Sequence, residues 1–324
     1  TLSSSSAASD VYKRQILYLS VIFFVQCVFA APKGITKVAP ENHNFFGRIT
    51  SYAHPKDVPD PVPMYQQFAA LAQQSNCHNY HINISVGDAT LLYSWGDNDR
   101  NQRLQLFHSK SLGIVASWAG MNPTKINSIL GAADVFLVDV DRRYFPHAEK
   151  GAKLYKGFQD AYKRVAPTFI KELQYYQELY NEDRVSLTGL SYGAALANIA
   201  LLHVKKNLKR GSIYRTVAFG LPRVGNQEWA NSIDKHADGK FFYVANGNDL
   251  VVRAPPRELG YQHPSGQIWI NPSNSSKWKF YPGQENVHGA NSEFGYSIPD
   301  HTGVYFRTEI ASLWGHCPAT VGKD

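Results

Sequence analysis

Short apolar runs alternate with segments of helical periodicity along the middle of the chain. The runs are rich in β-branched or aromatic residues and are bounded by polar residues or glycine, which predicts strands. These strands are expected at residues 112–118, 135–140, 184–190, 214–219 and 240–245. Helical spacing of apolar residues predicts helices at residues 156–180 (interrupted by Pro167), 192–208 and 226–236. The alternation favours an α/β fold, with a mostly parallel central sheet that helices cover on both faces.

The N-terminal region has the pattern of a targeting signal. Lys13 and Arg14 precede a mostly apolar stretch at residues 16–30, which ends in small residues as a signal-peptidase site does. This stretch is shorter than the ~20 residues that an ordinary transmembrane helix needs. An uncleaved N-terminal anchor is the alternative. We therefore expect a secreted, extracellular protein without a stable transmembrane anchor.

The remaining organisation follows from composition along the chain. We expect residues 1–15 to be assembly read-through, 16–30 to be the signal peptide and 31–62, which are rich in proline, to be a lead-in or propeptide. After residue 62 there is neither an internal repeat nor a low-complexity linker. Residues 63–324 are therefore predicted to form one domain.

Charge excludes one class of partner. The sequence has 33 basic and 26 acidic residues, a formal net charge of +7, but the two signs are interspersed. A nucleic-acid-binding protein would need a concentrated basic patch, and the longest basic runs are pairs such as Lys205–Lys206. We expect a solvated, mildly basic surface and no nucleic-acid partner.

A Gly-x-Ser-x-Gly sequence at Gly189–Gly193 is the first sign of chemistry. The motif alone is weak evidence, but here it joins a predicted strand to a predicted helix, as the nucleophile elbow of a hydrolase does. The glycines make steric sense, because a Cβ at either position would collide with a neighbouring strand or helix. Ser191 is thus a candidate nucleophile; the alternative is a structural serine in a tight turn.

A serine nucleophile needs a carboxylate and a base, which in α/β-hydrolases follow it in that order. Asp249 comes just after the strand predicted at 240–245, where the carboxyl ends of parallel strands bind ligands. A turn aspartate is the alternative. Asp234 and Asp238 lie on or just after a predicted helix and are interpreted as solvated.

Several histidines compete for the role of base. His301 follows Pro299–Asp300 at the head of a predicted C-terminal helix, which would hold an imidazole on a rigid element beside a loop. His263 is the second candidate. The pattern of residues leaves both open.

Taken together, the chain resembles the secreted fungal lipases of the class 3 family, which are α/β-hydrolases. The resemblance covers nearly all of residues 65–317 and rests on ordered segments rather than on one motif. These segments are Tyr155–Phe158, Gly189–Gly193, Phe219–Asn226, Asn248–Asp249 before Ala254–Pro256, Tyr261–Ile270, Asp300–His301 before Tyr305–Phe306, and a last cysteine. The resemblance implies Ser191 as nucleophile, Asp249 as acid and His301 as base.

The same resemblance suggests how the tetrahedral intermediate is stabilised. Two backbone N–H groups are needed. One would be that of Tyr192, and the other that of Met121, where many relatives have a hydroxyl residue. Relatives also have histidine and leucine where this elbow has Leu190 and Tyr192.

The segment 122–135 occupies the place of the family's mobile lid. Ile126, Ile129 and Leu130 share one face of a short amphipathic helix that could open at a lipid surface. The alternative is an ordinary half-buried surface helix.

The cysteines complete the family pattern. Removal of the signal peptide would discard Cys27 and leave Cys77 and Cys317. The resemblance implies a disulfide between these two, which would link the first helix to the C-terminus; two buried thiols are the alternative.

The sequence therefore predicts a secreted carboxylic-ester hydrolase, with a triacylglycerol lipase acting through an acyl-enzyme as the leading hypothesis. A feruloyl or other aryl-ester esterase on the same fold is one alternative, and a catalytically inactive lipid-binding protein is another. The expected partner is a lipid or ester substrate at an oil–water interface. We expect neither a metal nor an organic cofactor, because the sequence has no metal-ligand motif and no dinucleotide-binding fingerprint.

Overall fold

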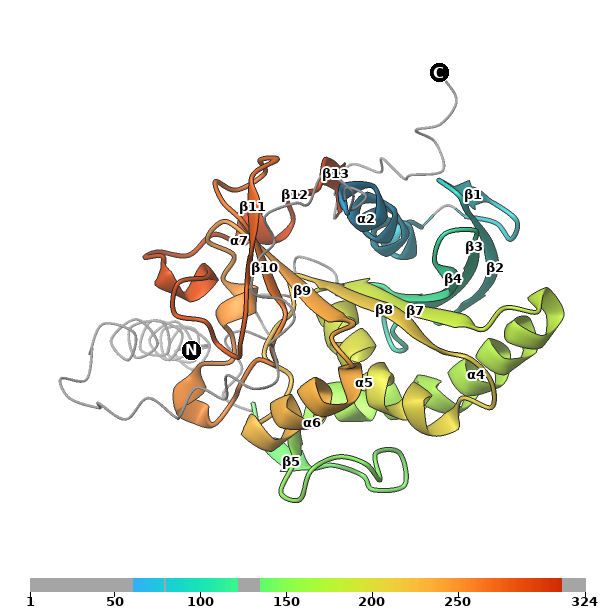
Figure 1. Cartoon of the computed structure of the whole chain (residues 1–324), viewed down its shortest axis with the longest axis horizontal. Helices are drawn as coiled ribbons and strands as arrows, with labels where there is room; N and C mark the ends of the chain where they lie inside the picture. The colour runs from blue at the N-terminus through green and yellow to red at the C-terminus, as the bar shows by residue number, and fades with distance from the viewer. Residues whose placement is uncertain (1–60, 79, 122–134, 311–324) are drawn as a thin grey trace, which may run out of the picture. The chain divides into compact units, whose positions relative to one another are not determined.

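A computed structural model of the protein describes residues 61–78, 80–121 and 135–310. These residues belong to one compact unit that begins at Pro61. Within them the main sheet has nine strands in the order β1-β2-β3-β4-β7-β8-β9-β10-β11 (Figure 1). The strands are β1 (Ser85–Val86), β2 (Ala89–Trp95), β3 (Leu104–Ser109), β4 (Gly113–Trp118), β7 (Arg184–Leu190), β8 (Ser212–Phe219), β9 (Phe241–Asn246), β10 (Gln267–Ile270) and β11 (Trp278–Tyr281).

The centre of this sheet is parallel and its edges are antiparallel. Strands β4, β7, β8, β9 and β10 pair in parallel, whereas β1 to β4 and β10 to β11 pair antiparallel. The parallel pairing expected from the sequence is confirmed for the central strands, but the sheet as a whole is mixed, with four parallel and four antiparallel pairings. Its carboxyl edge is where β4, β7 and β9 each lead into a segment with a candidate functional residue.

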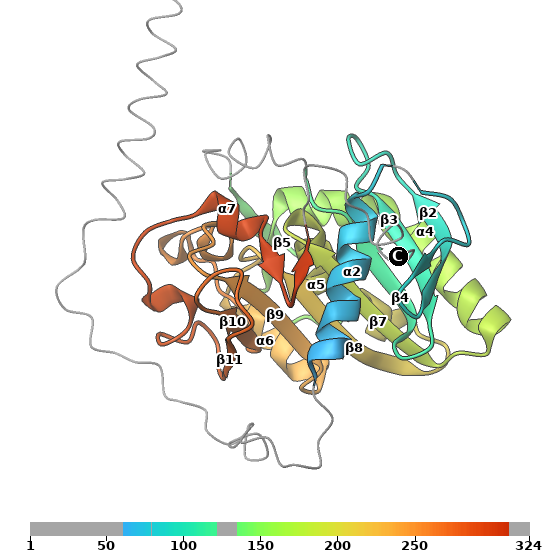
Figure 2. The same cartoon turned by 90° about the horizontal axis from the view of Figure 1, so that it is seen from above.

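Helices cover both faces of the sheet. Helix α2 (Val62–Asn76) lies on one face, where it crosses β4, β7 and β8 (Figure 2). On the other face are α4 (Lys156–Tyr180), α5 (Tyr192–Asn207) and α6 (Gln227–Ala237). Each face has its own buried apolar cluster, with Phe68 and Leu71 under α2 and with Phe169 and Leu196 under α4 and α5.

Shorter elements complete the described chain. They are the 3₁₀-helices η1 (Val251–Arg253), η2 (Arg257–Leu259) and η3 (Ala290–Ser292), the short helix α7 (Ile298–His301), and the strand pairs β5 (Leu137–Asp139) with β6 (Lys153–Tyr155) and β12 (Val304–Tyr305) with β13 (Thr308–Glu309).

The strand predicted at residues 135–140 is present as β5, but it pairs with β6 outside the main sheet. Two of its residues are partly buried and Asp139 is exposed, whereas a central strand needs both faces covered. The interruption predicted within the helix at residues 156–180 was wrong. Helix α4 is not interrupted at Pro167. This proline is exposed, and the helix continues through it because buried residues such as Val165, Ala166 and Phe169 hold the helix on the sheet.

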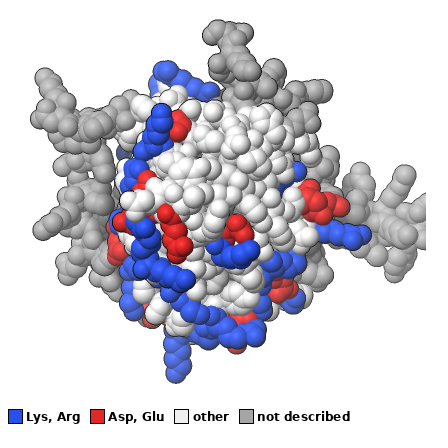
Figure 3. Space-filling view, turned by 90° about the vertical axis from the view of Figure 1, so that its right-hand side faces the viewer, with Lys and Arg blue, Asp and Glu red and all other residues white. Residues whose placement is uncertain are grey.

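The surface bears charges of both signs. Figure 3 shows one face, on which Lys and Arg side chains lie beside Asp and Glu side chains along the margins of a broad uncharged area. Within the described ranges, no helix combines the length and the apolar character of a membrane span.

Candidate active site

Ser191 lies in a strained turn between β7 and α5. Its backbone has φ 58° and ψ −120°, a conformation that residues with a side chain rarely adopt. Neighbouring glycines permit the turn: a Cβ on Gly189 would lie 2.5 Å from the backbone of Gly193, and one on Gly193 would lie 2.1 Å from the Trp118 carbonyl oxygen. The collision predicted from the motif is confirmed. Such a turn holds the serine at the carboxyl edge of the sheet.

Asp249 and His301 form a buried pair at the same edge. The Nδ1 atom of His301 lies 2.8 Å from Oδ2 of Asp249, and both side chains are fully buried. The other carboxylate oxygen accepts a 2.7 Å hydrogen bond from the Val251 amide. Because Nδ1 faces a carboxylate, it is the nitrogen that bears the proton in neutral His301, and Nε2 is left as the acceptor.

The two elements that carry this pair are joined by further hydrogen bonds. Asp249 follows β9, and His301 is the last residue of α7 rather than the first residue of a longer helix as expected. Asn246 donates to the Asp300 carbonyl oxygen at 2.8 Å, and the Asn248 amide donates to the Asp300 carboxylate at 2.7 Å. The ends of β9 and α7 are therefore held side by side.

Gly220 and Tyr305 surround the imidazole, and reasoning from the residues gave neither a role. A Cβ on Gly220 would lie 2.6 Å from Cε1 of His301, so only glycine leaves room for the ring. The Tyr305 hydroxyl lies 3.2 Å from the His301 carbonyl oxygen and 3.4 Å from the Asp249 carboxylate. The signal for Gly220 was a glycine directly after a predicted strand, a place where backbone and side chain can approach closely.

The imidazole lies beside the serine turn. The Phe219 carbonyl oxygen accepts a 2.9 Å hydrogen bond from the Ser191 amide, and the next residue, Gly220, contacts the ring. Nε2 of His301 is buried and has no hydrogen-bond partner among the described residues. A buried acceptor without a partner is costly in a purely structural site, and it is what a catalytic base presents to its substrate.

Comparisons with known proteins agree on one family. Residues 115–259 match the class 3 lipase family. Over 96% of this chain and 99% of the relative, the sequence is 99% identical to the secreted mono- and diacylglycerol lipase LIP2 of Malassezia restricta. It is 70% identical to the secreted mono- and diacylglycerol lipase MDL5 of Malassezia globosa, over 95% of this chain and 98% of the relative. The chain belongs to the class 3 lipase family. It is a secreted serine ester hydrolase, as the sequence predicted.

Solved structures agree on the fold of this class 3 lipase. The Lip2 lipase of Yarrowia lipolytica superposes with a TM-score of 0.68 at 20% sequence identity, over 79% of this chain and 95% of that chain. A lipase of Rhizopus microsporus var. chinensis gives 0.65 at 24% identity, over 78% of this chain and 90% of that chain. The α/β-hydrolase fold is confirmed.

The candidate oxyanion residues flank the elbow of the lipase. Tyr192 follows Ser191 as the first residue of α5, and half-buried Met121 follows β4 by three residues. The Tyr192 hydroxyl donates to the Gly157 carbonyl oxygen at 2.9 Å, and its ring packs edge-on against Phe158. The tyrosine that departs from the family pattern thus ties the elbow to the first turn of α4. Burial raises the pKa of this hydroxyl, which stays neutral.

The predicted lid residues Ile126, Ile129 and Leu130 lie outside the described residues.

His263, the second candidate for the base, has a structural environment. Its ring stacks on Tyr243, its Nε2 lies 2.8 Å from the Val252 carbonyl oxygen, and its amide donates to Glu285. Burial lowers the pKa of His263 to about 4. Burial opposes ionisation of Glu285, yet the adjoining Arg223 guanidinium lowers the pKa of that carboxyl to about 2.

Asp234 is not a freely solvated residue, contrary to expectation. Its carboxylate accepts hydrogen bonds from the Ser265 amide and hydroxyl, each at 2.8 Å, and from Gln284 at 2.7 Å. Burial raises its pKa. The sequence pattern could not show this, because the partners come from two separate loops, one before β10 and one after β11.

Cys77 directly follows α2, is buried and takes part in a disulfide. Cys317, the partner expected for it, lies outside the described residues, so the pairing stays a prediction.

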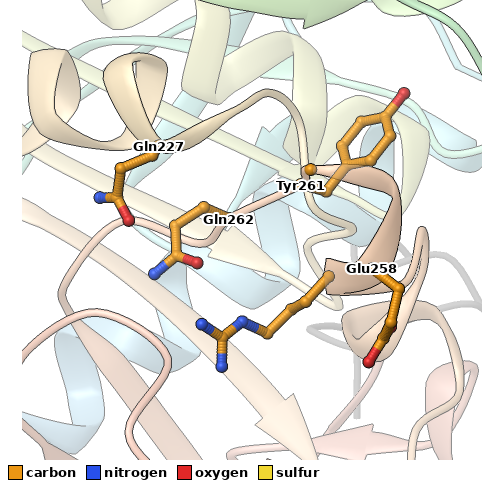
Figure 4. Close-up of a pocket in the computed structure, with 6 residues that line it drawn as sticks. Gln227, Glu258, Tyr261 and Gln262 are labelled. Atoms are coloured by element: carbon orange, nitrogen blue, oxygen red, sulfur yellow. The ribbon is translucent and has the colours of Figure 1, made fainter. Parts of the chain in front are cut away.

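The described residues also form a pocket of about 410 Å³. It is lined by Gln227, Arg257, Glu258, Gly260, Tyr261 and Gln262. Its side chains are mostly polar, and the Tyr261 ring turns away from the glutamines (Figure 4). None of the candidate catalytic residues lines it. Elsewhere in the described part of the chain, no group of three or more His, Cys, Asp or Glu side chains is arranged to hold a metal ion.

Proposed function

We propose that this lipase hydrolyses mono- and diacylglycerols through an acyl-enzyme on Ser191, with His301 as general base and Asp249 as the group that orients it. The observation that carries the proposal is the buried 2.8 Å contact between His301 and Asp249, which leaves Nε2 unpaired beside the strained serine turn. A serine hydroxyl is too weak an acid to attack an ester unless such a base takes its proton.

The proposed reaction has two halves. Nε2 of His301 takes the proton of the Ser191 hydroxyl as its oxygen bonds to the ester carbon, and the imidazolium then returns the proton to the departing glycerol oxygen. Water repeats the sequence on the acyl-enzyme and releases the fatty acid. The buried carboxylate of Asp249 holds the Nδ1–H tautomer and stabilises the imidazolium during both halves.

The negative oxygen of each tetrahedral intermediate needs donors that are already in position. We assign this role to the backbone amides of Tyr192 and Met121. Neither side chain takes part, so a methionine is compatible with the role. Loss of one such donor costs a hydrolase about 100- to 1000-fold in kcat.

Replacement of Ser191 tests the assignment. Ser191→Ala is expected to lower ester hydrolysis by several orders of magnitude with an unchanged melting temperature, because only the nucleophilic oxygen is lost. His301→Ala is expected to do almost as much damage, and the double variant little more, because the residues act as a unit. A purified Ser191→Ala protein that retains more than about a tenth of wild-type turnover on p-nitrophenyl butyrate would refute the proposal.

The substrate class rests on the names of the two Malassezia relatives, which specify mono- and diacylglycerols. We also propose that the lipase works at an oil–water interface. Several large apolar side chains are exposed, among them Phe136, Leu259 and Phe294, the last with 95% of its surface exposed. The Phe294 carbonyl oxygen accepts a hydrogen bond from Asn248, the neighbour of Asp249. An aggregated lipid would cover such side chains, whereas water does not.

One set of assays separates the substrate hypotheses. Initial rates are measured on mono-, di- and tributyrin and on methyl ferulate, each across its solubility limit. We expect the mono- and dibutyrin rates to exceed the tributyrin rate, and the glyceride rates to rise at the limit. A tributyrin rate above both others would favour the triacylglycerol hypothesis. Faster turnover of methyl ferulate, with simple saturation on glycerides, would favour the aryl-esterase hypothesis.

A further inference from the structure

The segment from Trp118 to Met121 packs against the first turn of α5. A Cβ on Gly193 would lie 2.1 Å from the Trp118 carbonyl oxygen and 2.6 Å from that of Ala119. The amide of Tyr192 begins the same turn. The backbone that leads to Met121 therefore passes directly beside the elbow, where small changes in its direction alter what its N–H groups face.

Gln102, in the loop between β2 and β3, holds this segment through two carbonyl oxygens. Its Nε2 donates to the Ala119 oxygen at 2.5 Å and to the Gly120 oxygen at 2.8 Å. It also lies 2.8 Å from Oδ1 of Asn98 in the same loop. One side-chain amide thus fixes two successive peptide groups.

Asn76, the last residue of α2, binds the N–H of the first of these peptide groups, the one between Ala119 and Gly120. Its Oδ1 accepts a 2.8 Å hydrogen bond from the Gly120 amide, and its Nδ2 donates to the Ala72 carbonyl oxygen at 2.8 Å. The peptide group between Ala119 and Gly120 is consequently bound at both its oxygen and its N–H.

Because the peptide group is planar, the direction of the Gly120 carbonyl also sets the direction of the Met121 N–H. In a trans peptide group the C=O and N–H bonds point in opposite directions. The Gly120 oxygen and the Met121 N–H belong to one such group. Because Gln102 holds the Gly120 oxygen, the Met121 N–H is turned to the opposite side.

We propose that Gln102 and Asn76 are positioning residues that aim the Met121 amide at the oxyanion. This inference rests on the proposed function, because it assumes the Ser191 acyl-enzyme and the two-amide oxyanion site. Neither residue touches the substrate. They act by keeping a donor oriented before the charge develops, which is the condition under which such donors accelerate a reaction.

Truncation of Gln102 tests the inference with a soluble substrate, p-nitrophenyl butyrate. Gln102→Ala is expected to lower kcat about ten- to hundredfold, less than complete loss of a donor, with KM changed less than about threefold. Gln174→Ala is the matched control, because Gln174 Nε2 donates to the Asn207 carbonyl oxygen at 2.9 Å and joins α4 to α5 far from the elbow. The control is expected to keep wild-type kcat even where its melting temperature falls.

Gln102→Glu distinguishes a positioning role from a merely structural one, because only a positioning role makes the effect on kcat depend on pH. When ionised, the introduced carboxylate would bring negative oxygens to two carbonyl oxygens and donate nothing, whereas its protonated form donates one O–H. The ratio of variant to wild-type kcat is therefore expected to rise as pH falls. Taking the ratio removes any pH dependence that both proteins share. Gln174→Glu should give a ratio that does not vary with pH.

Asn76 offers rescue by a conservative variant. Asn76→Asp keeps an acceptor for the Gly120 amide but loses the donor to the Ala72 carbonyl oxygen. It is therefore expected to rescue kcat in part, whereas Asn76→Ala is expected to lose about tenfold or more. The inference is overturned if Gln102→Ala and Asn76→Ala keep wild-type kcat, if they change only KM, or if the Gln102→Glu ratio is flat. Failure of the proposed function looks different, because Ser191→Ala would then stay active.

Discussion

Gly220 leaves the space in which the His301 imidazole lies. Its φ of +55° is one that alanine tolerates poorly, and a Cβ there would press on Cε1 and Nδ1 of the ring at 2.6 and 2.7 Å. The ring cannot retreat without loss of its contact with Asp249. Glycine at this position is therefore a requirement of the candidate triad as well as of the backbone.

We predict that Gly220→Ala lowers kcat on p-nitrophenyl butyrate at least tenfold by displacing the imidazole. Gly239→Ala is the control, because Gly239 has a similar φ of +69° but open space where its Cβ would lie. Both variants are expected to lose about 1–2 kcal/mol of stability from backbone strain. Only Gly220→Ala is expected to lose activity. Equal kcat values for the two variants would show that the contact with the ring does not matter.

Individual residues of the site differ in how far the sequence could predict them. Ser191 and Asp249 were candidates from local pattern, because Ser191 directly follows a strand that an apolar run predicts and Asp249 comes three residues after another. The choice of His301 over His263 needed the family resemblance, because both are late histidines near prolines. Gln102 and Asn76 escaped notice because their contacts with Gly120 span 18 and 44 residues and involve common polar side chains.

At the scale of elements, α4 and α5 are joined by a polar contact inside their apolar interface. The Tyr162 hydroxyl lies 2.9 Å from Nδ1 of His203, and both side chains are buried. Burial lowers the pKa of His203 from its ordinary value near 6.5 to about 4. The helical spacing predicted both helices, but not that a histidine on the buried face would be held neutral by its surroundings.

The lowered pKa of His203 predicts that the protein is less stable in acid. The unfolded chain binds a proton near pH 6.5 and the folded chain only near pH 4, so unfolding takes up a proton between these values. Stability is full above about pH 6.5 and falls as the pH is lowered toward 4, by at most about 1.4 kcal/mol per pH unit. His203→Gln removes this titrating group. Unfolding of the variant is expected to take up about one proton fewer in this pH range, so its free energy of unfolding depends less on pH.

Urea unfolding at several pH values from 4.5 to 7.5 measures that slope. His263, whose pKa is also lowered to about 4, contributes with the same sign in every variant, so some acid sensitivity remains. Tyr162→Phe is the control, because it removes the hydroxyl and keeps the buried imidazole. It should lose stability at all pH values and keep the slope; a His203→Gln slope equal to that of wild type would contradict the prediction.

At the scale of the whole molecule, the sheet arranges the candidate site from segments far apart in the chain. β4, β7 and β9 are parallel, so the segments that carry Met121, Ser191 and Asp249 emerge at one edge. These central strands were predictable because each is a buried apolar run. Strands β1 to β3, β10 and β11 were not predicted. β1, β10 and β11 are short and β2 is only partly buried, whereas the buried β3 has polar residues such as Gln105 and His108 within its apolar run.

The disulfide of Cys77 acts at this largest scale. We predict that its partner is Cys317, the one other cysteine left after signal removal. The bond would close a loop of about 240 residues, and restriction of the unfolded chain by so long a loop is worth up to ~5 kcal/mol. Non-reducing peptide mapping of the secreted protein should recover the two cysteines in one linked peptide; two free thiols would contradict the pairing.

Stability provides the complementary test. Reduction of the wild-type protein is expected to lower its melting temperature, because the unfolded chain regains the freedom that the bond removes. Cys77→Ala should begin at about the reduced value and respond no further to reductant, which separates loss of the bond from other effects of the reagent. Since α2 ends beside Cys77 and Asn76 reaches Gly120 from that same end, the variant should also lower kcat slightly if the bond helps to fix the end of the helix. A Cys77→Ala protein with the melting temperature of oxidised wild type would show that the bond adds no stability.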